Sequence, residues 1–263
     1  TYIMLYYNNE IYYGGKVMEK KLLKRSLSFA MMIAVVFSTI IASSFIKANA
    51  AETEKAVTLT QGENTSQHDT VQEAVAAVAA DNTQAVITLN KDFEGAGAVV
   101  KKDQNIVFNL NGFTWNINSL VGSSGTETNG VQLLQGSTVT IENGTLTSKT
   151  AKLLIQNYCD LTIRNATLSG QDNLTEIIVS NNNGSTVITG NSAVQAAAGG
   201  IAFDSDKWGG YQGGNVTLEN GQVIGNVNAT NGGKISLNGG TVTGDVIASN
   251  YNTKVMKKLL QIL

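Results

Sequence analysis

The stretch Ser137 to Ser148, STVTIENGTLTS, decides the fold class, because the same pattern returns further along the chain. Asp160 to Gly170 reads DLTIRNATLSG, and Ser185 to Ala196 reads STVITGNSAVQA. Two later copies are Asn215 to Gly225, NVTLENGQVIG, and Lys234 to Gly244, KISLNGGTVTG. Short segments that alternate apolar and polar residues are typical of strands, and their recurrence indicates a repeat architecture.

The spacing of these copies points to one coil of chain per copy. Their first apolar residues are separated by 22, 26, 29 and 19 residues and are Val139, Leu161, Val187, Val216 and Ile235. A propeller blade would need roughly twice this period, whereas a coil tolerates extra residues as loops. We therefore predict an all-β fold, a right-handed single-stranded parallel β-helix.

Alternation within each copy predicts which side chains face the core. Val139 and Ile141 should point inward, with Thr138 and Thr140 on the other side of the strand. After the turn, one apolar residue of each copy should again point inward: Leu146, Leu168, Val194, Val223 and Val242. Each coil should thus contribute at least two strands to a shared core.

An asparagine marks the turn inside most copies. The residues are Asn143, Asn165, Asn191 and Asn220, while the last copy has Gly239 in this position. Asparagine tolerates a left-handed backbone, and stacked amides can form hydrogen bonds along a stack of strands. We expect both features here.

Residues 18–50 have the organisation of a signal peptide. A basic segment, Met18 to Arg25, precedes an apolar stretch from Leu27 to Phe45 and the small-residue cleavage motif Ala48-Asn49-Ala50. We predict export to the cell surface or medium, with membrane contact only through this segment. The alternative is an uncleaved membrane anchor.

The remaining segments are assigned as follows. Residues 1–17 have no strand or helix period, and Gly14-Gly15-Lys16 can be encoded by a purine-rich ribosome-binding sequence, so this segment is expected to be untranslated upstream sequence. We assign residues 51–69 to a polar linker, 70–82 to a capping helix, 83–255 to the parallel β-helix and 256–263 to a tail.

Two of these assignments leave alternatives. Thr70 and Glu73 form a capping box, and Val71, Val75 and Val78 follow a helical spacing, so this helix could cover the end of the strand stack. The tail interrupts a further repeat, which suggests a truncation or frameshift product; a short basic tail that caps the stack is the alternative.

One segment carries a family resemblance. Ala85 to Trp115, AVITLNKDFEGAGAVVKKDQNIVFNLNGFTW, resembles the opening coils of bacterial surface β-helix proteins of the pectate-lyase-like superfold, as does the preceding TVQEAVAAVAA. The NLNGFT motif departs from the family's pattern in that Asn109 replaces an aspartate. The resemblance covers residues 70–250 and implies the fold; lyases, glycosidases, adhesins and passive stalks all use it.

Charge and cysteine content narrow the function classes. From Ala51 onward 12 Lys and Arg face 18 Asp and Glu, a net charge of −6, and Arg164 is the single arginine after Arg25. Nucleic-acid binding needs clustered lysine and arginine side chains, so this function is disfavoured. Cys159 is expected to be a small packed residue, since the one histidine, His68, is distant in sequence.

The most distinctive loop is Phe203 to Gly214, FDSDKWGGYQGG. Sugars are held by aromatic faces and polar groups, so the candidate ligand-binding residues are Trp208, Tyr211, Asp204, Asp206 and Gln212. Asp204 and Asp206 would share one strand face and are the candidate calcium ligands; no other cofactor is expected. Packing of Trp208 on the strands is the alternative interpretation.

These observations predict an extracellular, adhesin-like, non-catalytic β-helix, monomeric as a fragment, that binds a polysaccharide or another surface ligand. No catalytic residue is assigned, because no adjacent pair of aspartates is present for a glycosidase. A carbohydrate-active enzyme and a passive stalk on the same fold are the alternatives.

Overall fold

The computed structural model describes strands at 4–7, 10–13 and 16–18, and then residues 54–170, 175–207 and 213–248. The chain divides into two units, Thr1–Glu54 and Lys55–Leu263. In the first unit β1 (Met4–Tyr7), β2 (Glu10–Tyr13) and β3 (Lys16–Met18) form an antiparallel sheet. The predicted signal peptide after Met18 lies outside the described residues, and whether residues 1–17 are translated stays a prediction.

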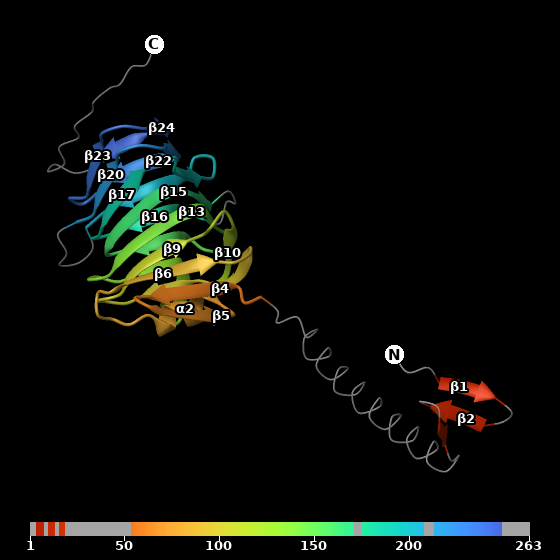
Figure 1. Cartoon of the computed structure of the whole chain (residues 1–263). Coiled ribbons are helices and arrows are strands. Elements are labelled where there is room, and N and C mark those ends of the chain that lie inside the picture. Colours follow the sequence, from red (N-terminus) through yellow and green to blue (C-terminus); the bar gives the residue numbers. More distant parts are fainter. Residues whose placement is uncertain are drawn as a thin grey trace. The chain divides into compact units, whose positions relative to one another are not determined.

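The second unit is all-β with parallel strands, as the repeats predicted, and its strands stack in three columns (Figure 1). Each repeat contributes one strand, or half of a long strand, to every column. Parallel pairing follows the order of the repeats, so strands adjacent in a column come from successive repeats. Long-range parallel contacts therefore hold the unit together.

The first column contains the strand that opens each repeat: β6 (Gln84–Leu89), β9 (Asn105–Asn109), the first half of β13 (Thr138–Ser148), the first half of β15 (Asp160–Gly170), β17 (Ser185–Thr189), β20 (Asn215–Leu218) and β23 (Lys234–Leu237). The second column contains β7 (Phe93–Ala96), β10 (Thr114–Ser119), the second halves of β13 and β15, β18 (Ala193–Ala196), β21 (Gln222–Ile224) and β24 (Thr241–Thr243).

The third column forms a separate sheet. Its members are β8 (Ala98–Val100), β12 (Thr126–Leu133), β14 (Leu153–Asn157), β16 (Ile177–Asn181), β19 (Ile201–Ser205), β22 (Asn226–Ala229) and β25 (Val246–Ala248). A short antiparallel strand, β11 (Val121–Ser123), pairs with β12 at its start.

The core lies between the columns and consists of aliphatic side chains in register. Leu146, Leu168, Val194 and Val223 are paired in sequence across adjacent strands, and each is at most 2% exposed. Burial of each such side chain contributes roughly 1.5 to 3 kcal/mol. The prediction for this row of side chains is confirmed.

The predicted alignment of the first strand is wrong by one residue in the third copy. Leu161 pairs with Thr186, not with Val187, and Val216 pairs with Thr186 from the other side. Thr186 is fully buried, while Val187 is half-buried on the opposite side of the strand. The buried amides of Asn157 and Asn181, described below, explain why a threonine is favoured inside.

The predicted left-handed backbone is found at two of the four turn asparagines. Asn143 and Asn165 have φ of 58° and 51°, whereas Gly190 and Gly221 adopt the positive φ next to Asn191 and Asn220. Glycine reaches this conformation at lower cost and releases the neighbouring asparagine from it.

The predicted ladder of turn amides is not continuous. Asn143 Nδ2 donates to Asn109 Oδ1 at 3.3 Å, and the Asn191 backbone N–H donates to Asn165 Oδ1 at 3.0 Å. These bonds join the repeats in pairs.

Residues 51–69 do not form only a linker. β4 (Val57–Gln61) and β5 (Asn64–His68) make an antiparallel hairpin that pairs with β6. Val57 and Leu59 alternate with polar residues and are buried, and Gly62 provides the turn with φ of 59°. The hairpin covers the first edge of the stack.

A helix, α2 (Val71–Ala77), lies at the same end, as predicted (Figure 1). Thr70 Oγ1 accepts from the Glu73 backbone N–H at 3.1 Å, and the Glu73 carboxylate accepts from the backbone N–H of Asp69, the residue before the N-cap, so the predicted capping box forms in a variant arrangement. The helix ends at Ala77, before the predicted residue 82, because Val78 already has an extended backbone. Among the residues described, no helix is long and apolar enough to cross a membrane.

Candidate binding groove

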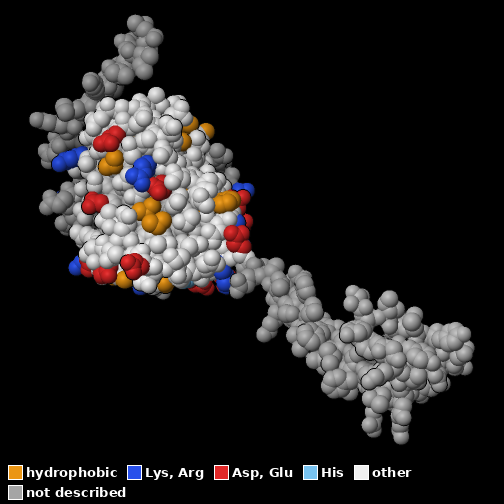
Figure 2. Space-filling model, in the orientation of Figure 1, with side chains coloured by type: hydrophobic (Ala, Val, Ile, Leu, Met, Phe, Trp, Pro, Cys, Tyr) orange, Lys and Arg blue, Asp and Glu red, His pale blue; other side chains and the backbone are white. Residues whose placement is uncertain are grey.

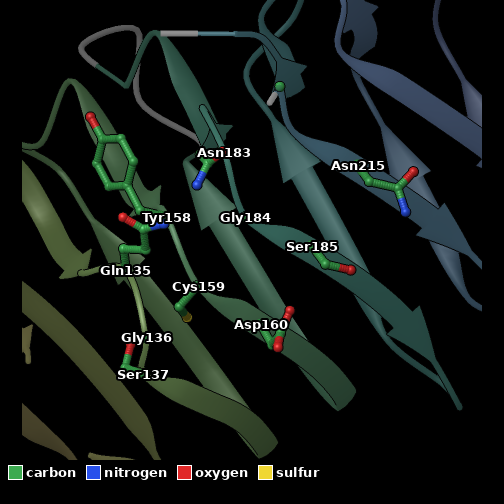
Figure 3. Close-up of a pocket in the computed structure, with 11 residues that line it drawn as sticks. Gln135, Gly136, Ser137, Tyr158, Cys159, Asp160, Asn183, Gly184, Ser185 and Asn215 are labelled. Atoms are coloured by element: carbon green, nitrogen blue, oxygen red, sulfur yellow. The ribbon is translucent and has the colours of Figure 1, made fainter. Parts of the chain in front are cut away.

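A groove of about 400 Å³ follows the corner where the chain passes from the third column to the first (Figure 3). Residues of four successive repeats line it. Three sets of register-equivalent residues contribute, with Gln135 beside them: the residues before the corner (Gly136, Tyr158, Asn183, Gly213), the corner itself (Ser137, Cys159, Gly184) and the strand starts that follow (Asp160, Ser185, Asn215).

The floor of the groove is shaped by glycine. A Cβ at Gly184 would lie 2.3 Å from the backbone oxygen of Cys159, and one at Gly214 would lie 1.9 Å from that of Asn181. No side chain fits at these distances, because successive repeats approach each other backbone to backbone. Glycine at these positions therefore lets successive repeats and the buried amides pack closely behind the groove.

Buried amides support the corner from the core side. Asn157 Nδ2 donates to Asn181 Oδ1 at 2.7 Å and to Thr186 Oγ1 at 3.0 Å. Asn181 Nδ2 donates to the backbone oxygens of Gly184 and Asn215 at 2.9 and 3.1 Å. Because all three side chains are fully buried, their mutual hydrogen bonds fix the path of the chain at the groove.

The strand starts place one polar side chain per repeat on the groove wall. Asp160, Ser185 and Asn215 are register partners on β15, β17 and β20. Adjacent strands lie about 4.8 Å apart, so these groups form a regularly spaced row. Asp160 is exposed, and the other two are half-buried.

Tyr158 adds an aromatic ring to this row of polar groups. Its ring is half-buried at the groove margin, and its hydroxyl accepts a hydrogen bond from Gln156 Nε2 at 2.9 Å (Figure 3). Gln156 also accepts from Gln132 Nε2 and Asn129 Nδ2, at 3.1 and 2.8 Å. This chain of amides orients the phenol, so the groove combines an anchored aromatic ring with hydrogen-bonding groups.

The acid content of the groove is low. Asp160 is the one carboxylate among the described residues that line it. Two-carboxylate glycoside hydrolysis needs a second acid roughly 5 to 9.5 Å away. The described lining offers hydrogen-bonding groups and no such pair.

Cys159 is confirmed as a packed residue. Its side chain is 4% exposed. Burial is the main reason that the pKa of the thiol is raised to about 12. A hydrogen bond with Ser137 lowers this pKa, and the negative charge of Asp160 raises it. The thiol is therefore protonated at neutral pH and is not a nucleophile.

The loop chosen from the sequence is described only in part. Trp208, Tyr211 and Gln212 lie outside the described residues. Asp204 lies on β19, and Asp206 follows the end of that strand. The chain re-enters the described part at Gly213, which lines the groove, so this loop and the groove are neighbours along the sequence.

Asp204 and Asp206 influence each other electrostatically. Burial raises the pKa of Asp204, the charge of Asp206 raises it further, and a hydrogen bond from Thr230 Oγ1, 3.4 Å away, lowers it. Asp206 accepts from the Lys207 backbone N–H at 2.6 Å. Within the described ranges no group of three or more His, Cys, Asp or Glu side chains could hold a metal, so calcium at Asp204 and Asp206 stays a prediction.

Sequence reasoning missed Gln135, Tyr158, Asp160 and Asn183. A signal was present in the last three copies, because a glycine precedes the first strand residue of each: Gly184, Gly214 and Gly233. Small residues at one fixed position of a repeat indicate a corner without side chains.

Comparison with protein-family models, with curated proteins and with solved structures finds no match to this chain.

Proposed function

We propose that this protein is an exported, right-handed single-stranded parallel β-helix that binds a glycan in the corner groove without catalysis. The observation that carries the proposal is the groove itself. It combines an anchored tyrosine with a row of polar side chains, one per repeat.

The β-helix assignment is supported by the register of the columns. The chain visits the first, second and third columns in the same order in every repeat, and each visit pairs parallel to the preceding repeat. Parallel strands joined by crossover connections are right-handed in nearly all proteins. Export is supported by the signal-peptide pattern of segment 18–50.

A glycan suits this groove chemically. The tyrosine ring can stack on the C–H surface of a sugar, while amide, hydroxyl and carboxylate groups bond its hydroxyls. The described residues that line the groove include one carboxylate and no lysine or arginine, which supports an uncharged ligand over a polyanion. On the face drawn in Figure 2, acidic and basic side chains are scattered.

Absence of catalysis is part of the proposal because the groove lining contributes a single carboxylate. An acid and a second carboxylate on opposite sides of a sugar are what glycosidases use. Turnover must therefore be measured together with binding.

The test measures binding to a panel of neutral and acidic polysaccharides by calorimetry. Tyr158→Ala should weaken binding about tenfold or more. Asp160→Asn should weaken it less, because an amide retains part of the hydrogen bonding. Thr145→Ala, on the second column of β13, is the matched control and should bind as the wild type does.

Three results would contradict the proposal. Released reducing ends or unsaturated uronates would identify an enzyme. Binding lost in Trp208→Ala but unchanged in Tyr158→Ala would move the site to the loop. Absence of binding to every polysaccharide would favour a passive stalk.

A further inference from the structure

The two ends of the strand stack differ in how well their cores are covered. At the first end β6 is followed outward by the hairpin β4–β5 and by α2, and Ala85, Ile87 and Leu89 of β6 are at most 1% exposed. This end is closed by segments that precede the repeats.

At the other end the inward-facing side chains of the last repeat are partly exposed. Val216, Leu218 and Val223 are at most 2% exposed. Their register partners in β23 and β24 are half-buried: Ile235, Leu237 and Val242.

The third column repeats this loss of burial. Val227 and Ala229 of β22 are at most 2% exposed. Of their partners in β25, Val246 is half-buried and Ala248 is exposed. One contiguous apolar surface, made of Ile235, Leu237, Val242, Val246 and Ala248, therefore lies at this end.

The sequence that follows β25 has a complementary pattern. At about 100° per residue, the apolar residues of 254–263 fall within an arc of roughly 160°. They are Val255, Met256, Leu259, Leu260, Ile262 and Leu263, and the opposite arc holds Lys254, Lys257, Lys258 and Gln261. The sequence alone thus predicts an amphipathic helix of this segment.

We propose that residues 254–263 dock their apolar side on the exposed end of the stack, on Ile235, Leu237, Val242, Val246 and Ala248, and cap it. Only residues 249–253 separate this segment from β25, so its local concentration at that surface is high. Exposed Glu219 and Asp245 of the last two repeats suit its lysines, although Lys234 opposes them. This inference is independent of the glycan proposal.

The same molecule contains a precedent for this arrangement. α2 buries Val71, Ala74 and Val75, at spacings of three and four residues, against the opposite end of the core. A short helix, together with the hairpin β4–β5, therefore covers this stack at one end. A competing partner is an anionic membrane, which basic amphipathic helices also bind.

The experiment is amide hydrogen exchange of β23, β24 and β25 in the intact protein. Leu259→Gln should accelerate exchange in these strands about tenfold or more and leave β13 and β15 unchanged. Lys257→Gln, on the polar arc, is the matched control and should exchange as the wild type does.

Two outcomes would overturn the proposal. The first is equal exchange in wild type and Leu259→Gln. The second is protection of β23 to β25 that appears only when phosphatidylserine-containing vesicles are added, because the tail would then bind membrane and not the core. In a parallel test, a separate 252–263 peptide added to a chain ending at residue 251 should restore protection.

Discussion

Asn157 and Asn181 are joined by a 2.7 Å hydrogen bond between their side chains, both fully buried, at the same corner of successive repeats. Two residues earlier in each strand, on the same side, the side chains are the buried Ile155 and Val179. Two amides at this depth are stable because their own donors and acceptors are matched, by each other, by the hydroxyl of Thr186 and by backbone groups.

Replacement of Asn181 by Ala should destabilise the protein by about 2 to 4 kcal/mol, because it removes one hydrogen-bond partner from Asn157, from Thr186 and from each of two backbone carbonyls. Urea unfolding measures this change. Asn191→Ala, at an exposed turn, serves as the control and should stay within about 0.5 kcal/mol of wild type. A similar loss of unfolding free energy in both variants would mean that the buried hydrogen bonds do not stabilise the protein more than an exposed turn does.

The register of β17 can be tested with lysine. Thr186→Lys should prevent folding or lower the midpoint of unfolding strongly, because it buries a charge in the core. Val187→Lys should be tolerated, because that side chain lies on the outer side of the strand. If the two variants exchanged roles, the strand would have the alignment that the sequence pattern suggested.

Asp204 should give a pH-dependent loss of stability. Its folded pKa lies above the ordinary 3.8, so the folded state favours the protonated form. The stabilising contribution is complete below pH 3.8 and is lost as the pH rises through the folded pKa. In EDTA, Asp204→Asn should therefore have a higher Tm than wild type at pH 7, and the difference should disappear near pH 3.5.

Bound calcium should favour the wild type over Asp204→Asn in the same Tm comparison. If Asp204 and Asp206 bind calcium, millimolar CaCl₂ should raise the Tm of the wild type, since a ligand of the folded state stabilises it, and should leave Asp204→Asn unchanged. Equal shifts in wild type, Asp204→Asn and Asp206→Asn would exclude these two carboxylates as the site.

The thiol of Cys159 should be protected from alkylation. Its pKa rises from 9.0 to about 12 on folding, mainly through burial. Iodoacetamide at pH 8 should modify the folded protein slower than the unfolded chain by a factor on the order of 100. Stability linked to this group should be present below pH 9 and be lost as the pH rises toward 12; Cys159→Ala should show a smaller loss over that range.

The sequence predicts the strands and their parallel stacking well, since apolar residues recur at fixed positions around turn residues, as Leu146, Leu168 and Val194 do. It fails where the pattern is ambiguous. Val187 and Ile188 are adjacent, so alternation alone could place either one inside. Hydrogen bonds from residues two repeats earlier, at Asn157, decide in favour of Thr186 and Ile188.

The groove was missed for a related reason. Tyr158, Asn183 and Asn215 belong to three repeats and are unremarkable individually. They become a site only because parallel register brings equivalent corners together. The loop with Trp208 attracted attention through its composition, whereas no local feature marks Tyr158.

The glycine corner separates the requirements of folding from those of recognition. Gly184 and Gly214 cannot change without a backbone clash, yet Ser185 and Asn215 beside them face outward and bear little of the packing. Mutation can therefore rewrite the chemistry of the groove while its shape is preserved. A scaffold of this kind can diversify its ligands over generations at little risk to its own stability.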